Sequence, residues 1–463
     1  MKKYDVAIIG GGPSGIFAAY ELNELNPGAN IIMMEKGKSI LKRKCPIIEH
    51  KVERCINCES CFIMQGFGGA GAYSDGKFNF TTQFGGWLNE YLPDKTILDL
   101  IEYVDSINVS FGATEKRYST DTPEARLLDK KALENDLHLL KAQVKHLGTE
   151  INLEILIKQY EYLNENITLK CDTQVNKIER LGECFRLTIN GGETIECDYL
   201  IAAPGRSGAE WFAGNCSELG LKLINNQVDI GVRVELPARI FEHITDVVYE
   251  AKLLYRTKQY GDVVRTFCMN PYGHVVAENV DGIVTVNGHS YSDPKLRSEN
   301  TNFALLVSNR FTYPFDQPYQ YGKRIASLSN MLGGGVLIQR FGDLIKGRRS
   351  TEHRMEQSFT TPTMKATPGD LSLVLTKRHL DNIIEMIYAL EKIAPGIAND
   401  DTLLYGVEVK FYSSRIELDN NLETAVKNMF AIGDGAGITR GLSQAGASGI
   451  HVARIISKRL ESK

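Results

Sequence analysis

The stretch VAIIGGGPSG (Val6–Gly15) decides how the start of this chain folds. Its first four residues are apolar and predict a buried strand, and apolar residues recur at helical spacing from Phe17 to Leu25. Glycines at positions 10, 12 and 15 connect these two elements. Such glycines allow a tight turn, a close approach of phosphate groups to the backbone, and close packing of the helix on the strand. The stretch therefore predicts the phosphate-binding turn of a dinucleotide site.

A second strand and an acidic residue complete the expected unit. Pro27-Gly28 ends the helix, Ile31–Met34 has the pattern of a second buried strand, and Glu35 follows about twenty residues after Gly15. A carboxylate in this position holds a ribose hydroxyl group. The complete unit predicts a site for FAD or NAD.

A segment near residue 434 favours FAD. The apolar run Met429–Ile432 ends in Gly433-Asp434, and residues 441–449 lead into a helix with one apolar stripe. The aspartate can meet the ribityl chain of a flavin, and the helix N-terminus can stabilise negative charge on the flavin ring. Flavoproteins commonly close the site of an opening dinucleotide unit with such a segment.

Two further segments are expected to approach the same cofactor. Residues 66–77 are rich in glycine, which predicts a loop whose backbone passes close to a large ligand. Residues 199–207 form an apolar strand ending at a glycine, and this position returns to the FAD in two-dinucleotide-type flavoproteins. The predicted FAD-binding residues are Gly10, Gly12, Pro13, Ser14, Gly15, Glu35, Lys36, Gly68, Gly69, Ser74, Gly76, Lys77, Val175, Ala203, Gly205, Arg206, Gly433, Asp434, Ser443, Gln444 and Ala445.

Four of the nine cysteines crowd into one short segment: Cys45, Cys55, Cys58 and Cys61. Cysteines separated by two residues can converge on a [4Fe–4S] cluster, and a fourth from a neighbouring loop can complete it. The same spacing suits redox-active or metal-free thiols, and also structural zinc. All three interpretations remain open at this point.

The composition is that of an ordinary soluble globular protein. The 463 residues are 43% hydrophobic and 24% charged, with a net charge of −4. This charge gives no general reason to expect nucleic acid or an anionic membrane as a partner. No apolar run reaches the roughly eighteen residues of a membrane span, and the first strand leaves no room for a signal peptide. We expect a cytoplasmic protein without a membrane span.

The pattern along the chain predicts an α/β fold with an interrupted FAD-binding domain. Residues 1–220 are expected to form its first part, including the Cys- and Gly-rich loop 45–80 and a helical segment over 88–165. Residues 221–410 are expected to form an inserted α+β substrate or cap domain, and residues 411–463 complete the FAD-binding domain. Residues 221–410 contain no second glycine fingerprint, so NAD(P)H would have to dock transiently.

Several segments together carry a resemblance to a known family: the four clustered cysteines, Gly68–Lys77, Phe267–Pro271, Val286–Ser290, Gly406–Glu408 and Gly433–Gly449. With them the chain resembles the bacterial and archaeal FAD-dependent dehydrogenases of largely uncharacterised function. This family lies within the glutathione-reductase-like flavoproteins, which include geranylgeranyl reductases. The resemblance covers nearly the whole chain and implies a glutathione-reductase-type Rossmann-like domain, bound FAD and oxidoreductase activity. The chain departs from the family pattern at Asn270 and within Glu408–Ser414.

We therefore expect an FAD-dependent oxidoreductase that transfers hydride or electrons between FAD and a small organic substrate, with reduction of a C=C bond as one specific form. The electron donor is expected to be NAD(P)H or a ferredoxin-like carrier. A geranylgeranyl-reductase-like prenyl reductase is one alternative. An RNA-directed flavoprotein and a non-catalytic FAD or iron–sulfur sensor are alternatives from other classes.

No residue stands out as the catalytic acid or base. The candidates are Lys77, His274, His289, Glu408 and Tyr412, which carry suitable groups for proton transfer. Glu408 has a structural role as the alternative to a catalytic one, namely an ion pair with Arg415 in or beside a strand.

Overall fold

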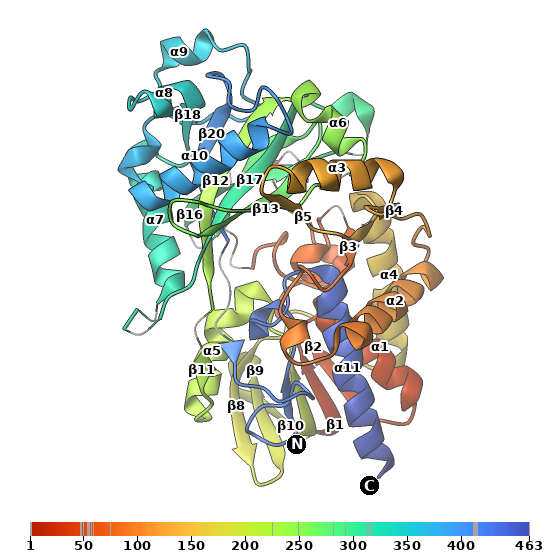
Figure 1. Cartoon of the computed structure of the whole chain (residues 1–463). Helices are drawn as coiled ribbons and strands as arrows, with labels where there is room; N and C mark the ends of the chain where they lie inside the picture. The colour runs from red at the N-terminus through yellow and green to blue at the C-terminus, as the bar shows by residue number, and fades with distance from the viewer. Residues whose placement is uncertain are drawn as a thin grey trace. The chain divides into compact units, whose positions relative to one another are not determined.

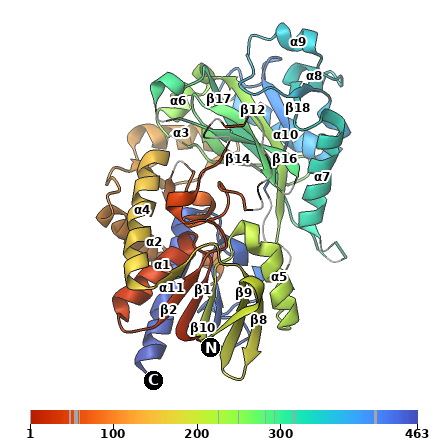
Figure 2. The same ribbon diagram turned by 180° about the vertical axis from the view of Figure 1, so that it is seen from behind.

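The computed structural model describes residues 2–462 except 47, 48, 50, 53–55, 57, 59, 75, 225, 249, 281, 292, 313, 316 and 411–414. The chain divides into two compact units, each of which is interrupted in the sequence. Unit 1 comprises Met1–Arg117, Ala142–Asn226 and Tyr412–Lys463, and unit 2 comprises Tyr118–Lys141 and Gln227–Phe411. Figures 1 and 2 show the elements of each unit from opposite sides.

Unit 1 is built around a seven-stranded sheet that contains the predicted first strand. β1 (Lys2–Ile9) runs parallel to β2 (Ile31–Met34) on one side and to β10 (Glu193–Ala202) on the other. The strand order is β7-β2-β1-β10-β9-β8, and β22 pairs in parallel with the end of β10. The other strands of this sheet are β7 (Thr168–Lys170), β8 (Val175–Leu181), β9 (Cys184–Ile189) and β22 (Met429–Ala431).

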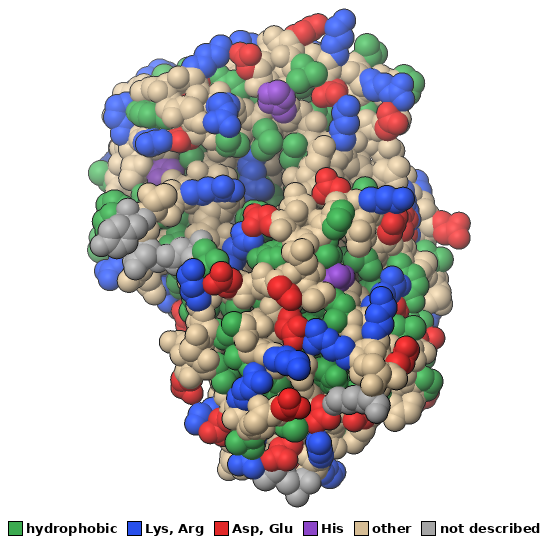
Figure 3. Space-filling view, turned by 60° about the horizontal axis from the view of Figure 1, so that its bottom comes forward, with side chains coloured by type: hydrophobic (Ala, Val, Ile, Leu, Met, Phe, Trp, Pro, Cys, Tyr) green, Lys and Arg blue, Asp and Glu red, His purple; other side chains and the backbone are tan. Residues whose placement is uncertain are grey.

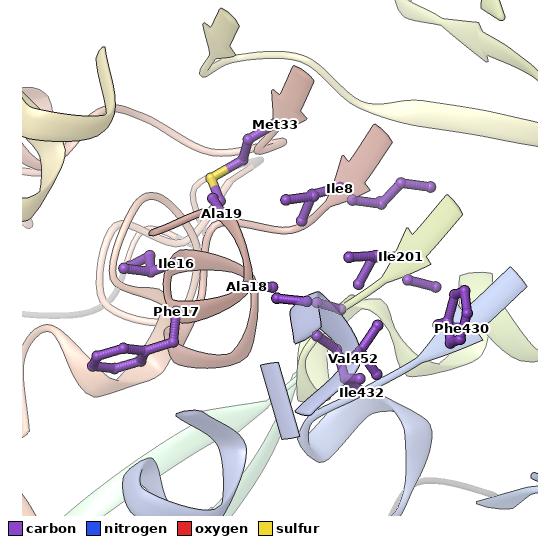
Figure 4. Close-up of a cluster of buried hydrophobic side chains, with 14 of the residues drawn as sticks. Ile8, Ile16, Phe17, Ala18, Ala19, Met33, Ile201, Phe430, Ile432 and Val452 are labelled. Atoms are coloured by element: carbon purple, nitrogen blue, oxygen red, sulfur yellow. The ribbon is translucent and has the colours of Figure 1, made fainter. Parts of the chain in front are cut away.

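Helices α1 (Pro13–Leu25) and α11 (Leu442–Glu461) pack against each other in unit 1. Gly449 permits this contact, because a Cβ there would lie 2.2 Å from the Ser14 carbonyl oxygen. Figure 4 shows side chains from α1, α11 and the sheet, including Phe17, Val452 and Ile201, meeting in one buried cluster. The remaining helices of unit 1 are α2 (Asp94–Ser110), α4 (Thr149–Asn166) and α5 (Ala209–Glu218), and its short strands are β3 (Lys77–Phe80), β6 (Gln143–His146), β11 (Leu223–Ile224) and β21 (Arg415–Ile416).

Unit 2 contains an eight-stranded sheet in the order β19-β18-β20-β12-β17-β14-β13-β5. Its strands are β5 (Leu137–Leu139), β12 (Val228–Pro237), β13 (Leu253–Arg256), β14 (Val263–Asn270), β17 (Asn300–Asn309), β18 (Leu337–Arg340), β19 (Thr367–Pro368) and β20 (Leu403–Lys410). A hairpin of β15 (His274–Val280) and β16 (Ile283–His289) is separate from this sheet. The helices are α3 (Pro123–Leu133), α6 (Glu242–Thr245), α7 (Pro318–Gly333), α8 (Phe341–Ile345), α9 (Glu352–Glu356) and α10 (Lys377–Glu391), and β4 spans Tyr118–Ser119.

The mixed α/β architecture agrees with the predicted FAD-binding α/β fold, whereas the glutathione-reductase subtype and the domain limits at 220 and 410 stay predictions. One expected element differs. The segment 88–165 is not helical throughout, because β5 and β6 lie between α3 and α4. Leu137 and Leu139 are buried while His138 is exposed, and β5 pairs with β13. This tertiary pairing overrides the helical spacing of Leu137, Leu140 and Val144.

Among the helices of the described residues, none is long and apolar enough to cross a membrane.

Candidate functional site

The turn after β1 has the geometry that its glycines predict. Gly10 has φ +105°, and a Cβ there would lie 2.1 Å from the Ala203 carbonyl oxygen. A Cβ on Gly15 would lie 2.0 Å from the Gly10 carbonyl oxygen. Gly12 differs, because a Cβ there would meet nothing within 4 Å. The chain therefore packs tightly on two sides of the turn and leaves open space at the position expected for a phosphate group.

Two helices begin at the predicted cofactor segments without a side-chain cap. α1 begins after Gly12 and α11 begins after Gly441. The first N–H groups of an uncapped helix and its dipole favour a negatively charged ligand. Gly433 lies against the start of α1, since a Cβ there would be 2.4 Å from Ser14 Oγ. These residues fit the pyrophosphate of FAD.

Glu35 is held by the backbone of this site. Its Oε2 accepts a hydrogen bond from Gly11 N at 2.8 Å. Its Oε1 accepts from Gly37 N at 2.9 Å and from Gly66 N at 3.0 Å. A carboxylate offers about four acceptor positions, so one position on Oε2 is left for a ribose hydroxyl group.

The glycine-rich loop lies directly against the phosphate-binding turn. Gly68 N donates to the Gly11 carbonyl oxygen at 2.7 Å, and a Cβ on Gly69 would lie 3.1 Å from Gly12 Cα. Gly68 has φ +90°, which L-residues with side chains rarely adopt. The sequence predicts a close approach in this loop, and the approach seen here is to the turn itself.

Arg43 shapes this loop and was missed by the sequence analysis. Its side chain is buried at 3% exposure, and burial lowers the pKa of the guanidinium. The Tyr73 hydroxyl donates to the Arg43 carbonyl oxygen, and the two side chains stack with Cζ 5.1 Å from the ring centre. The guanidinium donates to the carbonyl oxygens of Phe62, Ile63, Gly66, Phe67 and Gly69 at 2.7 to 3.4 Å. One feature of the sequence could have indicated its role: Arg43 is a single arginine among lysines, and only arginine carries a planar group with five hydrogen-bond donors.

The structure brings the predicted residues Arg206 and Asp434 to one hollow. Gly205 has φ +62°, and Asp434 Oδ1 accepts a hydrogen bond from the Thr439 hydroxyl at 2.8 Å. The hollow is lined by Trp87, Arg206, Asn226, Asp434, Gly437, Thr439 and Arg440. Trp87 and Arg440 were not predicted, because nothing in their local sequence marks them.

The start of α11 contacts β3 and the segment that follows it. Ser443 Oγ accepts from Asn79 N at 2.9 Å, and Gln444 Nε2 donates to the Phe84 carbonyl oxygen at 3.1 Å. The buried Gln444 Oε1 has no hydrogen-bond partner within the described part of the chain. A buried acceptor of this kind is available to a ligand.

The other predicted cofactor residues occupy varied positions. Ser74 Oγ donates to the Gly71 carbonyl oxygen, and Lys77 lies opposite His146 in the β3–β6 pair. Lys36 is exposed, and Val175 is buried in β8. Pro13, Gly76 and Ala445 lie at the start of α1, before β3 and in the first turn of α11.

The structure does not support the predicted cluster. Cys45, Cys58 and Cys61 are partly exposed free thiols. Within the described residues, no group of three or more His, Cys, Asp or Glu side chains is placed to hold a metal ion. Cys55, the fourth candidate ligand, lies outside those residues.

Two of the candidates for proton transfer come together in the structure. His274 and His289 face each other across the β15–β16 hairpin, and His274 Nε2 lies 2.9 Å from the Leu296 carbonyl oxygen. Tyr412 lies outside the described residues.

The alternative of an ion pair between Glu408 and Arg415 is wrong. Glu408 pairs with Arg233 in unit 2, whereas Arg415 donates to Glu90 Oε2 at 2.6 Å in unit 1. The partners are far apart in the sequence, so spacing could not identify them.

A comparison with protein families finds one match. Residues 227–411 match the family described as "FAD-dependent protein, C-terminal domain-like". The matched residues lie outside the glycine fingerprint at Gly10–Gly15, so this similarity to an FAD-dependent family is independent of the fingerprint. Among curated proteins, none matches this chain.

Solved structures show low similarity over almost the whole chain. The OxyS anhydrotetracycline hydroxylase from Streptomyces rimosus is 11% identical, with a TM-score of 0.39 over 99% of this chain. This chain spans 63% of the hydroxylase. A variant of NikD, an unusual amino acid oxidase essential for nikkomycin biosynthesis, is 11% identical with a TM-score of 0.42, covering 99% of this chain and 94% of that one. The L-proline dehydrogenase from P. horikoshii is 12% identical with a TM-score of 0.40, at the same coverage of 99% and 94%.

Proposed function

We propose that this chain is an FAD-dependent oxidoreductase in which unit 1 holds the FAD. The observation that carries the proposal is the open space at Gly12 beside the uncapped start of α1, in a turn where Gly10 and Gly15 tolerate no side chain. The family match over residues 227–411 supports the proposal from other residues. FAD, when bound, supplies the transfer of hydride or electrons.

The chain's own residues would bind and orient this group. The N–H groups at the start of α1 would bind the pyrophosphate, and Glu35 would accept a hydrogen bond from the ribose. Asp434 would hold the ribityl chain, and the start of α11 would stabilise negative charge at the flavin ring. The remaining FAD-binding residues predicted from the sequence, from Lys36 to Ala445, are also proposed to contact the cofactor.

Within this class we propose the glutathione-reductase-type arrangement. The substrate would be a small organic molecule, with reduction of a C=C bond as the first reaction to assay and a prenyl chain as an alternative substrate. Electrons would come from NAD(P)H or from a ferredoxin-like carrier. The described cysteines form no metal group and Cys55 lies outside the described residues, so the proposal does not depend on an iron–sulfur cluster.

The face drawn in Figure 3 and the net charge do not favour the RNA-directed alternative. Figure 3 shows basic and acidic side chains interspersed over the visible face, and the net charge of the chain is −4. Binding to a nucleic acid backbone favours a continuous basic surface.

Replacement of Gly12 tests the proposed FAD site. The Gly12→Ala protein should fold normally because its Cβ meets no protein atom, yet its FAD content should fall at least tenfold because the methyl group takes the place of a phosphate oxygen. Flavin absorbance and reduction by dithionite measure the content, and the melting temperature of the FAD-free protein measures folding. Gly28→Ala is the matched control, since it is equally unobstructed and lies outside the site.

Two results would contradict the proposal. One is a wild-type protein that carries no flavin after incubation with FAD. The other is a Gly12→Ala protein with wild-type flavin content.

A further inference from the structure

A group of buried charges lies on one side of β12 in unit 2. Ile230, Val232 and Val234 belong to the apolar core of this unit. The alternate residues Asp229 and Arg233 point to the opposite face of the sheet, and both are 0% exposed. Charged side chains are almost never fully buried unless they are paired.

Within this group, the carboxylate of Glu408 contacts two cations. Arg233 donates to both oxygens of Glu408, from Nε to Oε2 at 2.8 Å and from Nη2 to Oε1 at 2.9 Å. Lys410 Nζ lies 2.9 Å from the same Oε1. The side chains of Arg233 and Glu408 are 0% exposed and that of Lys410 is 8% exposed. A single carboxylate neutralises only one of these cations.

The next carboxylate does not remove the imbalance. Asp229 lies opposite Lys410 in the β12–β20 register and already accepts a hydrogen bond from Arg265. Among the described residues, this group therefore joins the cations Arg233, Arg265 and Lys410 to the carboxylates Asp229 and Glu408. By direct pairing, one cation of the group therefore has no carboxylate of its own, since Glu278 is linked to Arg233 only through the Asn287 amide. A further anion would stabilise this cation where water has little access.

Glu235 does not supply that anion. It follows Arg233 on the same face of β12, about 20 Å along the strand from Asp229 at the usual rise per residue. Its carboxylate is already bound by neutral donors from Asn300, Thr363 and Tyr405.

Phe267 adds an apolar wall beside the excess charge. The ring is partly exposed, and its centre lies 5.1 Å from Arg265 Cζ and 5.8 Å from Lys410 Nζ. Lys252 Nζ, which pairs with Glu250, is also 5.8 Å from the ring centre. An aromatic ring bordered by cations suits a flat organic group that carries a carboxylate.

The backbone next to Phe267 is held in an uncommon conformation. Cys268 has φ +47° at a break in the β14–β17 register between Phe267 and Asn270. Its carbonyl oxygen accepts a hydrogen bond from Arg233 Nη1 at 3.0 Å. Such conformations cluster at ligand-binding sites, where the surrounding structure maintains them.

We propose that three side chains of this region bind an organic acid: Arg265 and Lys410 bind its carboxylate, and Phe267 contacts its flat part. Flat organic acids would then be the substrate class of the enzyme. The identification of the acid as a substrate rests on the proposed function, whereas the binding of the acid does not.

The test uses 4-fluorobenzoate and the full-length protein, with binding followed by the broadening of the fluorine NMR signal. Wild-type protein should bind 4-fluorobenzoate and should not bind 4-fluorobenzamide, which has the same shape without the charge. Lys410→Met and Phe267→Leu should each weaken binding at least tenfold. Lys346→Met, which removes an exposed lysine of the same unit, is the matched control and should bind as the wild type does.

A melting temperature separates binding from a purely structural role of Lys410. If Lys410 serves as a ligand-binding cation, the Lys410→Met protein should melt at or above the wild-type temperature, because the Arg233–Glu408 pair remains and the excess charge is gone. A lower melting temperature with unchanged 4-fluorobenzoate binding would overturn the proposal, as would unchanged binding in both variants.

The failures of the two proposals are distinguishable. A flavin-containing protein that does not bind 4-fluorobenzoate overturns the organic-acid site and leaves the proposed function standing. A protein that binds 4-fluorobenzoate through Lys410 but never takes up flavin overturns the proposed function and leaves the organic-acid site standing.

Discussion

Arg43 holds the loop over the phosphate-binding turn through five backbone carbonyl groups. Removing a buried charged donor leaves these acceptors without partners, which costs about 3 kcal/mol. In an Arg43→Met protein, we expect the N–H of Gly68 to exchange with deuterium about 100-fold faster, because local opening of the loop becomes that much easier. FAD content should fall in parallel.

Two variants control for the loss of charge alone. Lys42→Met removes an exposed neighbouring cation and should leave the exchange of Gly68 unchanged. Arg43→Lys keeps the charge without the planar fork, so it should restore only part of the protection. Wild-type exchange in Arg43→Met would show that the loop does not depend on this side chain.

The residues that could be predicted from the sequence are those whose role is local. Gly10 and Gly15 are needed by the turn in which they stand, so a short pattern identifies them. Arg43 and Arg233 depend on partners far along the chain, and the sequence alone does not show which cation is buried.

Among the elements, α1 and α11 pack at a distance that only a glycine permits at position 449. A Gly449→Ala substitution places a Cβ 2.2 Å from the Ser14 carbonyl oxygen and must push the helices apart, so it should destabilise the FAD-free protein by about 1 to 3 kcal/mol. Gly214→Ala, in the exposed part of α5, meets nothing and should stabilise it by about 0.5 to 1 kcal/mol.

Thermal unfolding of the two FAD-free variants measures both effects, and their opposite signs are the prediction. A stabilising effect of Gly449→Ala would show that the contact between α1 and α11 tolerates a Cβ at position 449. It would also weaken the case that both helix starts are fixed at one site.

The elements were predictable where the local pattern and the tertiary pairing agree. Asn190-Gly191 predicts a hairpin, and β9 and β10 pair around it with Gly191 at φ +69°. The apolar spacing over 380–392 predicts a helix, and α10 spans Lys377–Glu391. Between α3 and α4 the same spacing was misleading, because β5 is held by β13 from more than a hundred residues away.

For the molecule as a whole, His379 makes stability depend on pH. Burial lowers the pKa of His379 to about 4, from an ordinary value of 6.5. The neutral ring is held between the Thr376 hydroxyl at 2.7 Å and Asn309 Oδ1 at 3.0 Å. As the pH falls through 6.5 the unfolded chain takes up a proton that the folded chain refuses, so stability is complete above pH 6.5 and is lost toward pH 4. The loss should reach up to about 3 kcal/mol.

Thermal unfolding of the wild type and of His379→Gln between pH 4 and 7.5 isolates this contribution from other titrating groups. The difference between the two proteins should shrink as the pH falls. A difference that stays constant over this range would mean that His379 is not buried as a neutral ring.

The division into two units could be predicted only in part. The glycine fingerprint and the Gly433-Asp434 segment indicate that distant parts of the chain share one unit, and β22 does pair with β10 beside β1. The inclusion of Tyr118–Lys141 in unit 2 could not be predicted, because it depends on the pairing of β5 with β13.

The interruption of unit 1 also delays its completion during translation. Residues 227–411 are translated after the inner strands of unit 1 have emerged and before β22 and α11 exist, an interval of about 10 to 40 seconds at usual rates of synthesis. During this interval β10 lacks its neighbour β22, and α1 lacks α11, the helix against which it packs most extensively. The apolar surfaces that β22 and α11 cover in the finished unit therefore stay exposed until α11 has been made.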